Sequence, residues 1–385
     1  MNKKDINKKA EIRFIKLRRK DSQYFIQKVK DNFKLETIID KKYKVMHENN
    51  YALFPLVENK ELISELIKFI NNFIPFEIIT KVGIKNQNYK FRTLDEALVG
   101  KIPHDYLFLV PKSYDIIGDI AILEFKEVNS IDKNEIEEFK HLISQAVVQV
   151  NKNVRTVYEK KSEVKGAYRL REFTFLIGEN KSETIHKENN CVFKLDIKHT
   201  YFSPRLVFER RRVSKSNIQK NEVIIDMFSG VGPFSLQIAR LNDVEIHAFD
   251  VNPQAYDYLK INIGLNKLVG KIIPYNMDIK DLLNPVNQLG RKLQNTVDRI
   301  IMNLPRNSID FANVACFLMK KSGGILHLYN IFEKPNSTTK ALNIIKKELI
   351  ELKWEIEKVV VSKIVKSHSP KADLVVNDLK IKYSN

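Results

Sequence analysis

The sequence predicts a doubly wound α/β domain with a mostly parallel sheet in its second half, preceded by smaller α+β domains. Two observations support this fold class. From about Tyr201 onward, short β-branched runs alternate with segments of helical apolar spacing, as a parallel sheet covered by helices requires. A pair of glycines also separates the first of these strands from the first helix. The length of 385 residues and the apolar content of 43% are enough for two to three packed domains.

The elements of the second half follow from this alternation. Five strands are expected at residues 223–228, 245–250, 271–276, 298–302 and 324–329. Helices are expected at 234–241, 253–266, 308–319 and 338–352. Two extended runs, 355–365 and 373–381, predict a closing antiparallel hairpin. Residues 284–296 fit neither a strand nor a crossover helix, so a surface insertion is expected there.

The first half is expected to hold two domains, at residues 1–70 and 71–198, with the sheet domain at 199–385. Residues 1–31 carry 11 Lys and Arg against 4 Asp and Glu, which indicates a small basic module. Strands are expected at 106–110 and 116–125, and a helix is expected to begin at Asn134. Ser130 or Asp132 is expected to cap that helix, because a side-chain oxygen there accepts from amides of the first turn.

The composition limits the partners and the compartment. A formal net charge of +18 indicates an acidic partner such as nucleic acid, although the abundance of Lys, Asn and Ile also fits a genome-wide nucleotide bias. Cys191 and Cys316 lie far apart without a CxxC motif, which argues against a disulfide framework or zinc site and fits a reducing, cytoplasmic compartment. No signal peptide or membrane-spanning run is recognisable, so a soluble protein is expected.

The segment IIDMFSGVGPFSL, residues 224–236, is the candidate cofactor loop. Gly230 and Gly232 let the backbone approach a ligand, while amides of the following helix point at it. Asp250 ends the second strand, where its carboxylate could accept from both hydroxyls of a ribose. These features suit a dinucleotide or S-adenosylmethionine. The missing third glycine, together with Asp226 in the first strand and Asp278 after the third, favours S-adenosylmethionine.

The fourth strand ends in Asn303, Leu304 and Pro305, the candidate acceptor loop. Proline fixes the backbone, so the Asn303 amide is held at the carboxyl edge of the sheet, where open α/β sheets bind ligands. Methyl transfer to a planar ring nitrogen needs such a rigid polar loop, because the acceptor must align with the sulfur–methyl bond. Taken alone, this turn would indicate only the entry to a helix.

Several segments, taken in order, resemble the archaeal and eukaryotic tRNA (guanine-37-N1)-methyltransferase family. They are YRLREFTFLIGENKSETIHKENNCVFKLD (168–196), YFSPRLVFERRRV (201–213), DMFSGVGPFS (226–235), FDVNPQAYDYLKINIGLNK (249–267), MNLPRNS (302–308) and VKSHSPKADLVVNDLKI (365–381). The resemblance covers about residues 105–385, and YFSPRL is similar to the archaeal form. It implies a class I S-adenosylmethionine-dependent methyltransferase, Rossmann-like with a mostly parallel seven-stranded sheet, behind N-terminal α+β RNA-binding domains.

The resemblance implies transfer of methyl to the imino nitrogen of the guanosine just 3′ of the tRNA anticodon. That nitrogen carries a proton, so a base must remove it while the charge on the exocyclic oxygen is stabilised. By similarity, Glu209 is the base and Arg169 holds the exocyclic oxygen, with Arg171 as the competing arginine. The guanine must leave its stack, so an aromatic platform such as Tyr201 is expected.

The resemblance also assigns the other site residues. The catalytic group is Glu209, Arg169 and Asn303, and the substrate-binding group is Tyr201 and Pro305. The cofactor-binding group is Arg205, Phe228, Gly230, Gly232, Asp250, Asp278 and Asn303, with Arg205 contacting either RNA phosphate or cofactor. No metal is expected. The implied partner is a tRNA with guanosine at position 37, bound by a monomer.

Three alternatives differ in chemistry. A related enzyme of wybutosine synthesis transfers the aminocarboxypropyl group at the same tRNA position, and a bifunctional enzyme also methylates the tricyclic intermediate. The loop at Asn303 favours simple methyl transfer, because family members that make the aminocarboxypropyl transfer generally lack it. A non-catalytic RNA-binding module is disfavoured by Glu209, Asp250 and Asn303 together. A nicotinamide-dependent reductase is disfavoured by the missing third glycine.

Overall fold

The computed structural model describes residues 11–33, 38–98, 101–126, 132–163 and 166–384. The chain divides into two compact units, Met1–Arg92 and Thr93–Asn385. Within the described stretches, no helix combines the length and the apolar character needed to cross a membrane.

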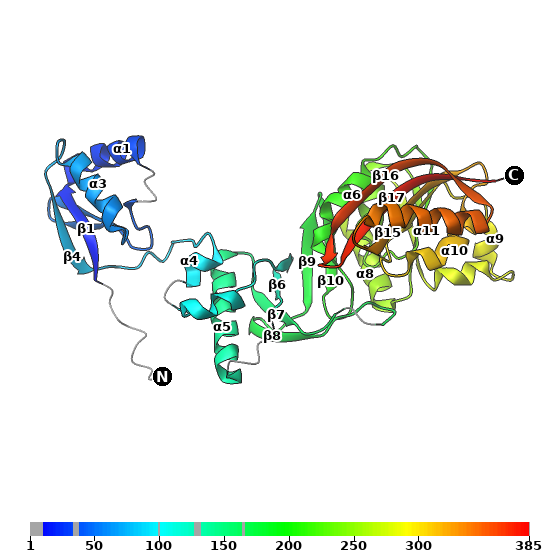
Figure 1. The fold of residues 1–385 in the computed structure, drawn as a ribbon, viewed down its shortest axis with the longest axis horizontal. Helices are drawn as coiled ribbons and strands as arrows, with labels where there is room; N and C mark the ends of the chain where they lie inside the picture. Colours follow the sequence, from blue (N-terminus) through cyan, green and yellow to red (C-terminus); the bar gives the residue numbers. More distant parts are fainter. Residues whose placement is uncertain (1–10, 34–37, 99–100, 127–131, 164–165, 385) are drawn as a thin grey trace. The chain divides into compact units, whose positions relative to one another are not determined.

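The first unit is built on a four-stranded antiparallel sheet of order β2-β3-β1-β4 (Figure 1). Its strands are β1 (Glu11–Arg18), β2 (Met46–Glu48), β3 (Tyr51–Pro55) and β4 (Phe76–Val82), and its helices are α1 (Ser22–Asn32) and α3 (Lys60–Ile70). Both helices pack apolar residues against β1, including Phe25, Val29, Ile63 and Leu66. Because β4 pairs with β1, the expected domain boundary at residue 70 falls within this unit.

The second unit starts with an α+β part. Its helices are α4 (Leu94–Leu98), the 3₁₀ helix η2 (His104–Leu109) and α5 (Lys133–Val150). Its sheet has the order β5-β6-β7-β8, formed by Asp115–Ile117, Ile120–Leu123, Thr156–Lys160 and Phe173–Gly178. The predicted helix at Asn134 is confirmed as α5, and Asp132 caps it by accepting from the amides of Asn134 and Glu135. Ser130, the other candidate cap, lies outside the described residues.

Two strand predictions in this part need correction. Residues 106–110 do not form a strand; they belong largely to η2, where the amide of Tyr106 donates to the carbonyl of Pro103. The local turn after Pro103 overrides the apolar composition of that run. The run at 116–125 is interrupted at Gly118, whose φ of 59° turns the chain into the antiparallel pair β5 and β6.

A two-stranded ribbon leads into the second half of the unit. It consists of β9 (Glu183–Glu188) and β10 (Cys191–Asp196), and is followed by the 3₁₀ helix η3 (Pro204–Leu206) and helix α6 (Val207–Ser214). Glu188 at the end of β9 forms a buried ion pair with Arg210 of α6. His186 accepts a hydrogen bond from the amide of Gly118 through Nδ1. These two contacts tie the α+β part, the ribbon and α6 together.

The second half is a seven-stranded sheet of order β13-β12-β11-β14-β15-β17-β16, which confirms the predicted mostly parallel fold. The five parallel strands are β11 (Val223–Asp226), β12 (Glu245–Asp250), β13 (Lys271–Asn276), β14 (Arg299–Met302) and β15 (Gly324–Glu333). The predicted hairpin is β16 (Trp354–Ser369) and β17 (Ala372–Tyr383), and β17 lies antiparallel between β15 and β16.

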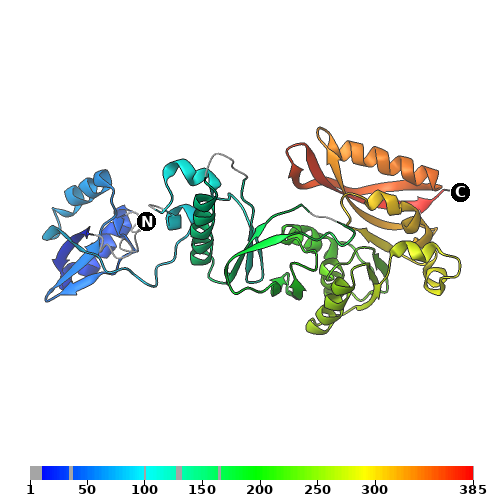
Figure 2. The ribbon, with the colours of Figure 1, turned by 90° about the horizontal axis from the view of Figure 1, so that it is seen from below.

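Helices cover both faces of this sheet, because alternate strand residues point to opposite sides. Ile224 and Ile301 belong to the core that includes residues of α7 (Pro233–Leu241) and α8 (Pro253–Leu265). Ile225 and Ile300 belong to the core that includes residues of α10 (Ala312–Leu318) and α11 (Ser337–Glu351). Figure 2 shows α11, in orange, lying along the red strands of the hairpin. The predicted helix at 308–319 begins as a 3₁₀ turn, η5 (Ser308–Phe311).

The expected surface insertion at 284–296 is also wrong in part. It contains helix α9 (Gln288–Leu293), which follows the 3₁₀ helix η4 (Ile279–Leu283). Leu293 of α9 and Leu282 of η4 are buried in the same core as β14. A Cβ atom at Gly290 would lie 2.1 Å from the carbonyl oxygen of Leu282, so only glycine allows this close packing. The helix is too short to give a clear period.

Candidate active site

A cavity of about 230 Å³ opens at the carboxyl ends of β11, β12 and β14, the edge at which α/β sheets bind ligands. It lies in the second unit and draws residues from loops that are distant in the sequence. Those that bear on its chemistry are Arg169, Tyr201, Arg210, Phe228, Gly230, Asp250, Asp278, Ile279, Asn303, Leu304 and Phe311.

The glycine loop forms one wall of the cavity and begins helix α7. Gly230 has a φ of 53°, lines the cavity and donates its amide to Oδ2 of Asp250 over 2.7 Å. Gly232 has a φ of 89° and does not line the cavity. A Cβ atom on Gly232 would lie 2.4 Å from Cδ1 of Leu259 in α8. Gly232 therefore shapes the turn, while Gly230 faces the ligand space.

Two carboxylates line the cavity at the ends of neighbouring strands. Asp250 also accepts from the amide of Asn252 at 2.9 Å, and burial raises its pKa despite both backbone hydrogen bonds. Asp278 follows β13 and caps η4 by accepting from the amide of Lys280. Asp226 does not line the cavity; burial raises its pKa to about 7, although the Ser235 hydroxyl donates to it. Asp226 thus acts as a structural residue in this fold.

The cavity fits a nucleoside cofactor. Val251, Ile279 and Phe311 supply apolar walls for a flat base, and the rings of Phe228 and Phe311 meet edge to face with centroids 4.8 Å apart. Asp250 and Asp278 provide acceptors for hydroxyl and amino groups. Of the predicted cofactor residues, Phe228, Gly230, Asp250, Asp278 and Asn303 line this space, whereas Arg205 and Gly232 do not. Arg205 is instead paired with Asp115.

The loop after β14 is held rigid from behind. The backbone carbonyl of Pro305, a buried residue, accepts from the amide of Ile331 at 2.7 Å. Ser308 accepts from the amide of Leu304 at 3.0 Å. Asn303 and Leu304 line the cavity, and Pro305 lies behind them. Oδ1 of Asn303 is buried and has no hydrogen-bond partner among the described residues, so it can accept a hydrogen bond from a ligand.

Arg169 faces the cavity from the opposite side, between β7 and β8. Its φ of 56° is unusual for a non-glycine residue. Its Cζ lies 4.9 Å from the centre of the Tyr201 ring, and its Nε is buried without a hydrogen-bond partner in the described chain. Burial lowers its pKa, and the neighbouring cations Arg306 and Arg171 add to this. Arg171 does not line the cavity, so the structure brings Arg169 rather than Arg171 to it.

Glu209 lies on α6, just behind the cavity wall. It is 4% exposed and does not line the cavity, whereas Leu206 and Arg210 beside it do. Its Oε1 lies 2.7 Å from Nζ of Lys363, and its Oε2 lies 2.8 Å from Nη2 of Arg212. The Tyr329 hydroxyl donates to Oε2 at 3.3 Å. Burial alone would raise the pKa of Glu209, but the two cations outweigh it and lower the pKa.

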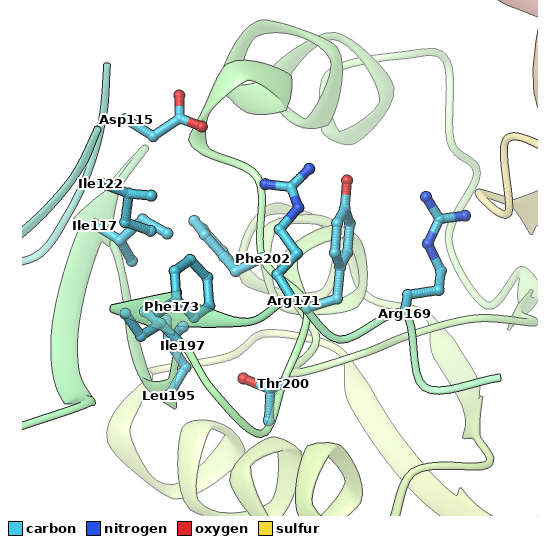
Figure 3. Close-up of a pocket in the computed structure, with 11 residues that line it drawn as sticks. Asp115, Ile117, Ile122, Arg169, Arg171, Phe173, Leu195, Ile197, Thr200 and Phe202 are labelled. Atoms are coloured by element: carbon cyan, nitrogen blue, oxygen red, sulfur yellow. The ribbon is translucent and has the colours of Figure 1, made fainter. Parts of the chain in front are cut away.

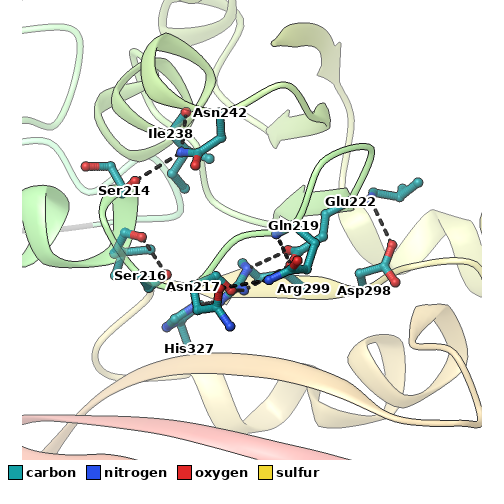
Figure 4. A network of polar contacts seen from close by, with 12 residues as sticks. Ser214, Ser216, Asn217, Gln219, Glu222, Ile238, Asn242, Asp298, Arg299 and His327 are labelled. Carbon is teal, nitrogen blue, oxygen red and sulfur yellow. Dashed lines mark hydrogen bonds and ion pairs between the residues drawn. The ribbon is translucent and has the colours of Figure 1, made fainter. Parts of the chain in front are cut away.

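Arg212 continues this contact into a buried chain of charges. It pairs with Asp378 of β17, which in turn lies 2.8 Å from Nδ1 of His327 in β15. Burial opposes ionisation of Asp378, but His327 and Arg212 prevail and lower its pKa to about 2. Nε2 of His327 meets Arg299, whose guanidinium pairs with Glu222 at 2.9 Å (Figure 4). The orientation of Arg212, and through it that of Glu209, is therefore fixed across the sheet.

Sequence reasoning missed this supporting chain. Lys363 and His327 lie outside the quoted segments, and Asp378 lies in the last of them without an assigned role. Only the antiparallel pairing of β15 with β17 places His327 opposite Asp378. The available signal was an aspartate inside the apolar strand run LVVNDLKI. No group of three His, Cys, Asp or Glu side chains in the described part of the chain is arranged to hold a metal.

Comparisons with known proteins agree with this arrangement. Residues 184–357 match the TRM5/TYW2 methyltransferase domain, and residues 94–181 match the TYW2 N-terminal domain. The tRNA (guanine(37)-N(1))-methyltransferase Trm5b of Methanocaldococcus jannaschii is 36% identical over 89% of this chain and 92% of its own length. The structure of an aTrm5–tRNALeu complex aligns with a TM-score of 0.72 at 32% identity, over 95% of this chain and 99% of that one.

A structure from the other branch is similar over a shorter span. Pyrococcus horikoshii TYW2 in complex with MeSAdo aligns with a TM-score of 0.60 at 28% identity. The alignment covers 98% of that chain but only 76% of this one. The quarter left over is about the size of the first unit, Met1–Arg92.

Proposed function

This chain belongs to the TRM5/TYW2 methyltransferase family, and on that premise we propose how its cavity methylates N1 of the guanosine at tRNA position 37. One observation carries the proposal. Arg169 offers a buried donor without a partner and Asn303 a buried acceptor without one, both at the same cavity. The Watson–Crick edge of guanine presents an acceptor, O6, and donors, N1 and the 2-amino group, in that order. A guanine held by both residues has its N1 between them.

The cofactor is S-adenosylmethionine, which supplies an electrophilic methyl group on a sulfonium. Asp250 accepts from the ribose hydroxyls, because its position at the end of β12 matches that role. Asp278 accepts from the adenine amino group, and Phe228, Ile279 and Phe311 pack on the base. Gly230 allows the backbone to come close to the cofactor without a side chain.

The chain's own residues then handle the proton and the charge. Glu209 is the general base that accepts the N1 proton, and Arg169 donates to O6 as negative charge spreads there. Asn303 accepts from the 2-amino group, Tyr201 packs beside the extruded base, and Pro305 fixes the loop. Glu209 does not line the cavity, so to take the substrate proton it must give up its contact with Lys363 and turn towards the cavity.

Transfer of an aminocarboxypropyl group remains the second candidate, because the family includes both chemistries. Two observations favour methyl transfer. The loop Asn303-Leu304-Pro305 is present and rigid, and the tRNA methyltransferase relatives match nearly the whole chain, whereas the TYW2 structure leaves a quarter of it unmatched. A further methylation of the tricyclic intermediate would use the same cavity, and its test requires a tRNA that carries that intermediate at position 37.

The first unit is proposed to contact the body of the tRNA. Its basic N-terminal segment gives attraction to phosphate that weakens with salt. The α+β part before Asp196 is proposed to link it to the methyltransferase domain. A monomer in the cytoplasm is proposed as the working form, in keeping with two buried free thiols, Cys191 and Cys316.

The test is methyl transfer from labelled S-adenosylmethionine to two tRNA transcripts, one with guanosine and one with adenosine at position 37, followed by nucleoside analysis. We expect 1-methylguanosine in the first transcript only. The label is in the methyl group, so absence of label from the guanosine transcript while the cofactor still binds would refute the proposed reaction.

A further inference from the structure

A second, narrower pocket lies next to the active-site cavity and shares Arg169, Tyr201 and Phe202 with it. Its floor is apolar, and its polar residues include Arg171, which lines this pocket but not the cavity. We call it the arginine slot; its lining residues are Asp115, Ile117, Ile122, Arg169, Arg171, Phe173, Leu195, Ile197, Thr200, Tyr201 and Phe202. Figure 3 shows Arg169 and Arg171 extending in the same direction, away from Leu195 and Ile197.

Cations from several distant segments gather around the slot. Lys366 of β16 has its pKa lowered by burial and by the nearby charges of Arg205 and Arg171, against a smaller opposing effect of Asp115. His368 of β16 is not one of these cations, because burial, Arg306 and Lys366 lower its pKa and keep its ring neutral near pH 7. The α+β part, η3 and the terminal hairpin therefore each bring a cation to the slot or its edge, namely Arg171, Arg205 and Lys366.

The protein does not fully satisfy these groups. Arg205 donates through Nε to Asp115 at 2.6 Å, and Glu163 is occupied by Lys160 at 3.0 Å. By contrast, Nε of Arg171 and Nε of Arg169 are buried with no hydrogen-bond partner among the described residues. A buried donor without an acceptor costs about 1–3 kcal/mol. Cζ of Arg169 and Cζ of Arg171 lie 4.9 and 6.0 Å from the centre of the Tyr201 ring, so both unpartnered donors belong to side chains at this ring, as expected of a site whose acceptor is a ligand.

We propose that the arginine slot binds a backbone phosphodiester of the substrate RNA, held by Arg171, which lines the slot, with Lys366 contributing charge from outside its lining. The inference rests on the proposed function and divides the labour of the two arginines: Arg169 serves the base in the cavity, and Arg171 serves the backbone beside it. A phosphodiester suits the slot because its tetrahedral oxygens accept from a guanidinium fork and an ammonium together. Phe173 and Ile117 of the apolar floor suit the adjoining ribose. The slot is narrower than the neighbouring cavity, which favours a phosphate over a second base.

The experiment pairs variants of the full chain with a chemically neutral backbone. A tRNA transcript with guanosine at position 37 is prepared with a single methylphosphonate linkage on the 5′ or the 3′ side of that nucleotide. We expect one of the two linkages to weaken binding to the wild-type protein by about tenfold, and Arg171→Gln to weaken binding of the unmodified tRNA by a similar factor. When the variant and that linkage are combined, the affinity should fall little further than with either change alone, because each change removes the same contact.

Controls separate the possible failures. Arg155→Gln removes an exposed arginine that directly precedes β7 and pairs with Glu179. Any loss of affinity that this variant shows should be the same for the modified and the unmodified tRNA. Lys366→Gln repeats the cycle if Arg171→Gln does not fold, and cofactor affinity reports folding. If the affinity losses of the variant and of the linkage multiply, or if neither linkage has an effect, the slot assignment is overturned. Methylation of guanosine 37 would still stand in that case. Wild-type protein that neither binds nor methylates the unmodified tRNA would overturn the proposed function as well.

Discussion

Nζ of Lys363, on the edge strand of the sheet, lies 2.7 Å from Oε1 of Glu209 on the helix behind the active-site cavity. This contact, with that of Arg212 on the other carboxylate oxygen, keeps Glu209 ionised although it is buried. In the proposed mechanism, Glu209 is therefore an ionised base near neutral pH, and the release of Lys363 sets when it can accept a proton.

Replacing Lys363 should move the acid limb of the pH–rate profile. Lys363→Met removes a cation that lowers the pKa of Glu209 while its burial remains, so that pKa rises. The single-turnover methylation rate should then begin to fall at a higher pH than in the wild type. Lys358→Met, an exposed lysine of the same strand, is the matched control. An acid limb unmoved in Lys363→Met would mean that the base is another group.

Replacing the base itself should separate binding from chemistry. Glu209→Gln is expected to keep the affinity for S-adenosylmethionine, because Glu209 does not line the cavity, and to lower the single-turnover rate by about 100-fold or more. The exposed Glu357→Gln of β16 controls for the loss of a negative charge. A rate within a few-fold of wild type would remove Glu209 from the mechanism.

Asn303 should set the discrimination between guanosine and inosine, which lacks the 2-amino group. The unpartnered Oδ1 of Asn303 would stay unsatisfied with inosine, which costs about tenfold or more in kcat/KM. Asn303→Ala is expected to lower the rate on guanosine and to abolish the preference. The measurement is competition between tRNA transcripts carrying either nucleoside at position 37, and a preference unchanged in Asn303→Ala would contradict the assignment.

The buried charge chain predicts a pH-dependent stability. The pKa of Asp378 is lowered from 3.8 to about 2 in the folded protein, so folding favours its ionised form. This contribution, roughly 2–3 kcal/mol, is complete above about pH 4 and is lost as the pH falls towards 2. Asp378→Asn should therefore lower the free energy of unfolding by roughly that amount at pH 7, with a smaller difference at pH 3. Denaturant titrations at the two pH values test this, and equal differences would disprove it.

Removal of the first unit should affect only the RNA. Deleting residues 1–92 leaves the compact unit Thr93–Asn385, which contains the whole cavity. We expect unchanged affinity for S-adenosylmethionine, weaker tRNA binding and a smaller slope of log Kd against log salt. Calorimetry and filter binding measure the two quantities, and unaltered salt dependence would show that this unit makes no phosphate contacts.

The sequence was most informative where local signals decide the structure. The strands predicted at 245–250 and 271–276 match β12 and β13, because apolar and β-branched runs are bounded there by turn residues. The spacing of Gly230 and Asp250 predicted that both lie at adjacent strand ends, and in the structure the amide of Gly230 donates to Asp250. The strand prediction at 106–110 was wrong because a short apolar run shows no clear periodicity. The turn after Pro103 then determines the local structure.

The contacts of Glu209 could not be predicted from the sequence, for a different reason. Lys363 and Asp378 reach the α6 region only through the pairing of β17 between β15 and β16, which brings together residues more than 150 positions apart. The choice between Arg169 and Arg171 likewise depends on the packing of one loop against Tyr201. Neither arrangement leaves a local pattern.

The buried pair of Glu188 and Arg210 has a consequence for how this chain can diverge. Arg210 lines the cavity and donates to Glu188 with both Nε and Nη2, and Gln237 donates to the same carboxylate. Loss of either partner strands an uncompensated charge in the interior, at about 3–5 kcal/mol, close to the whole stability of many domains. The two positions should therefore covary among descendants of this sequence. A substitution of Arg210 in the cavity wall should be accompanied by a substitution of Glu188.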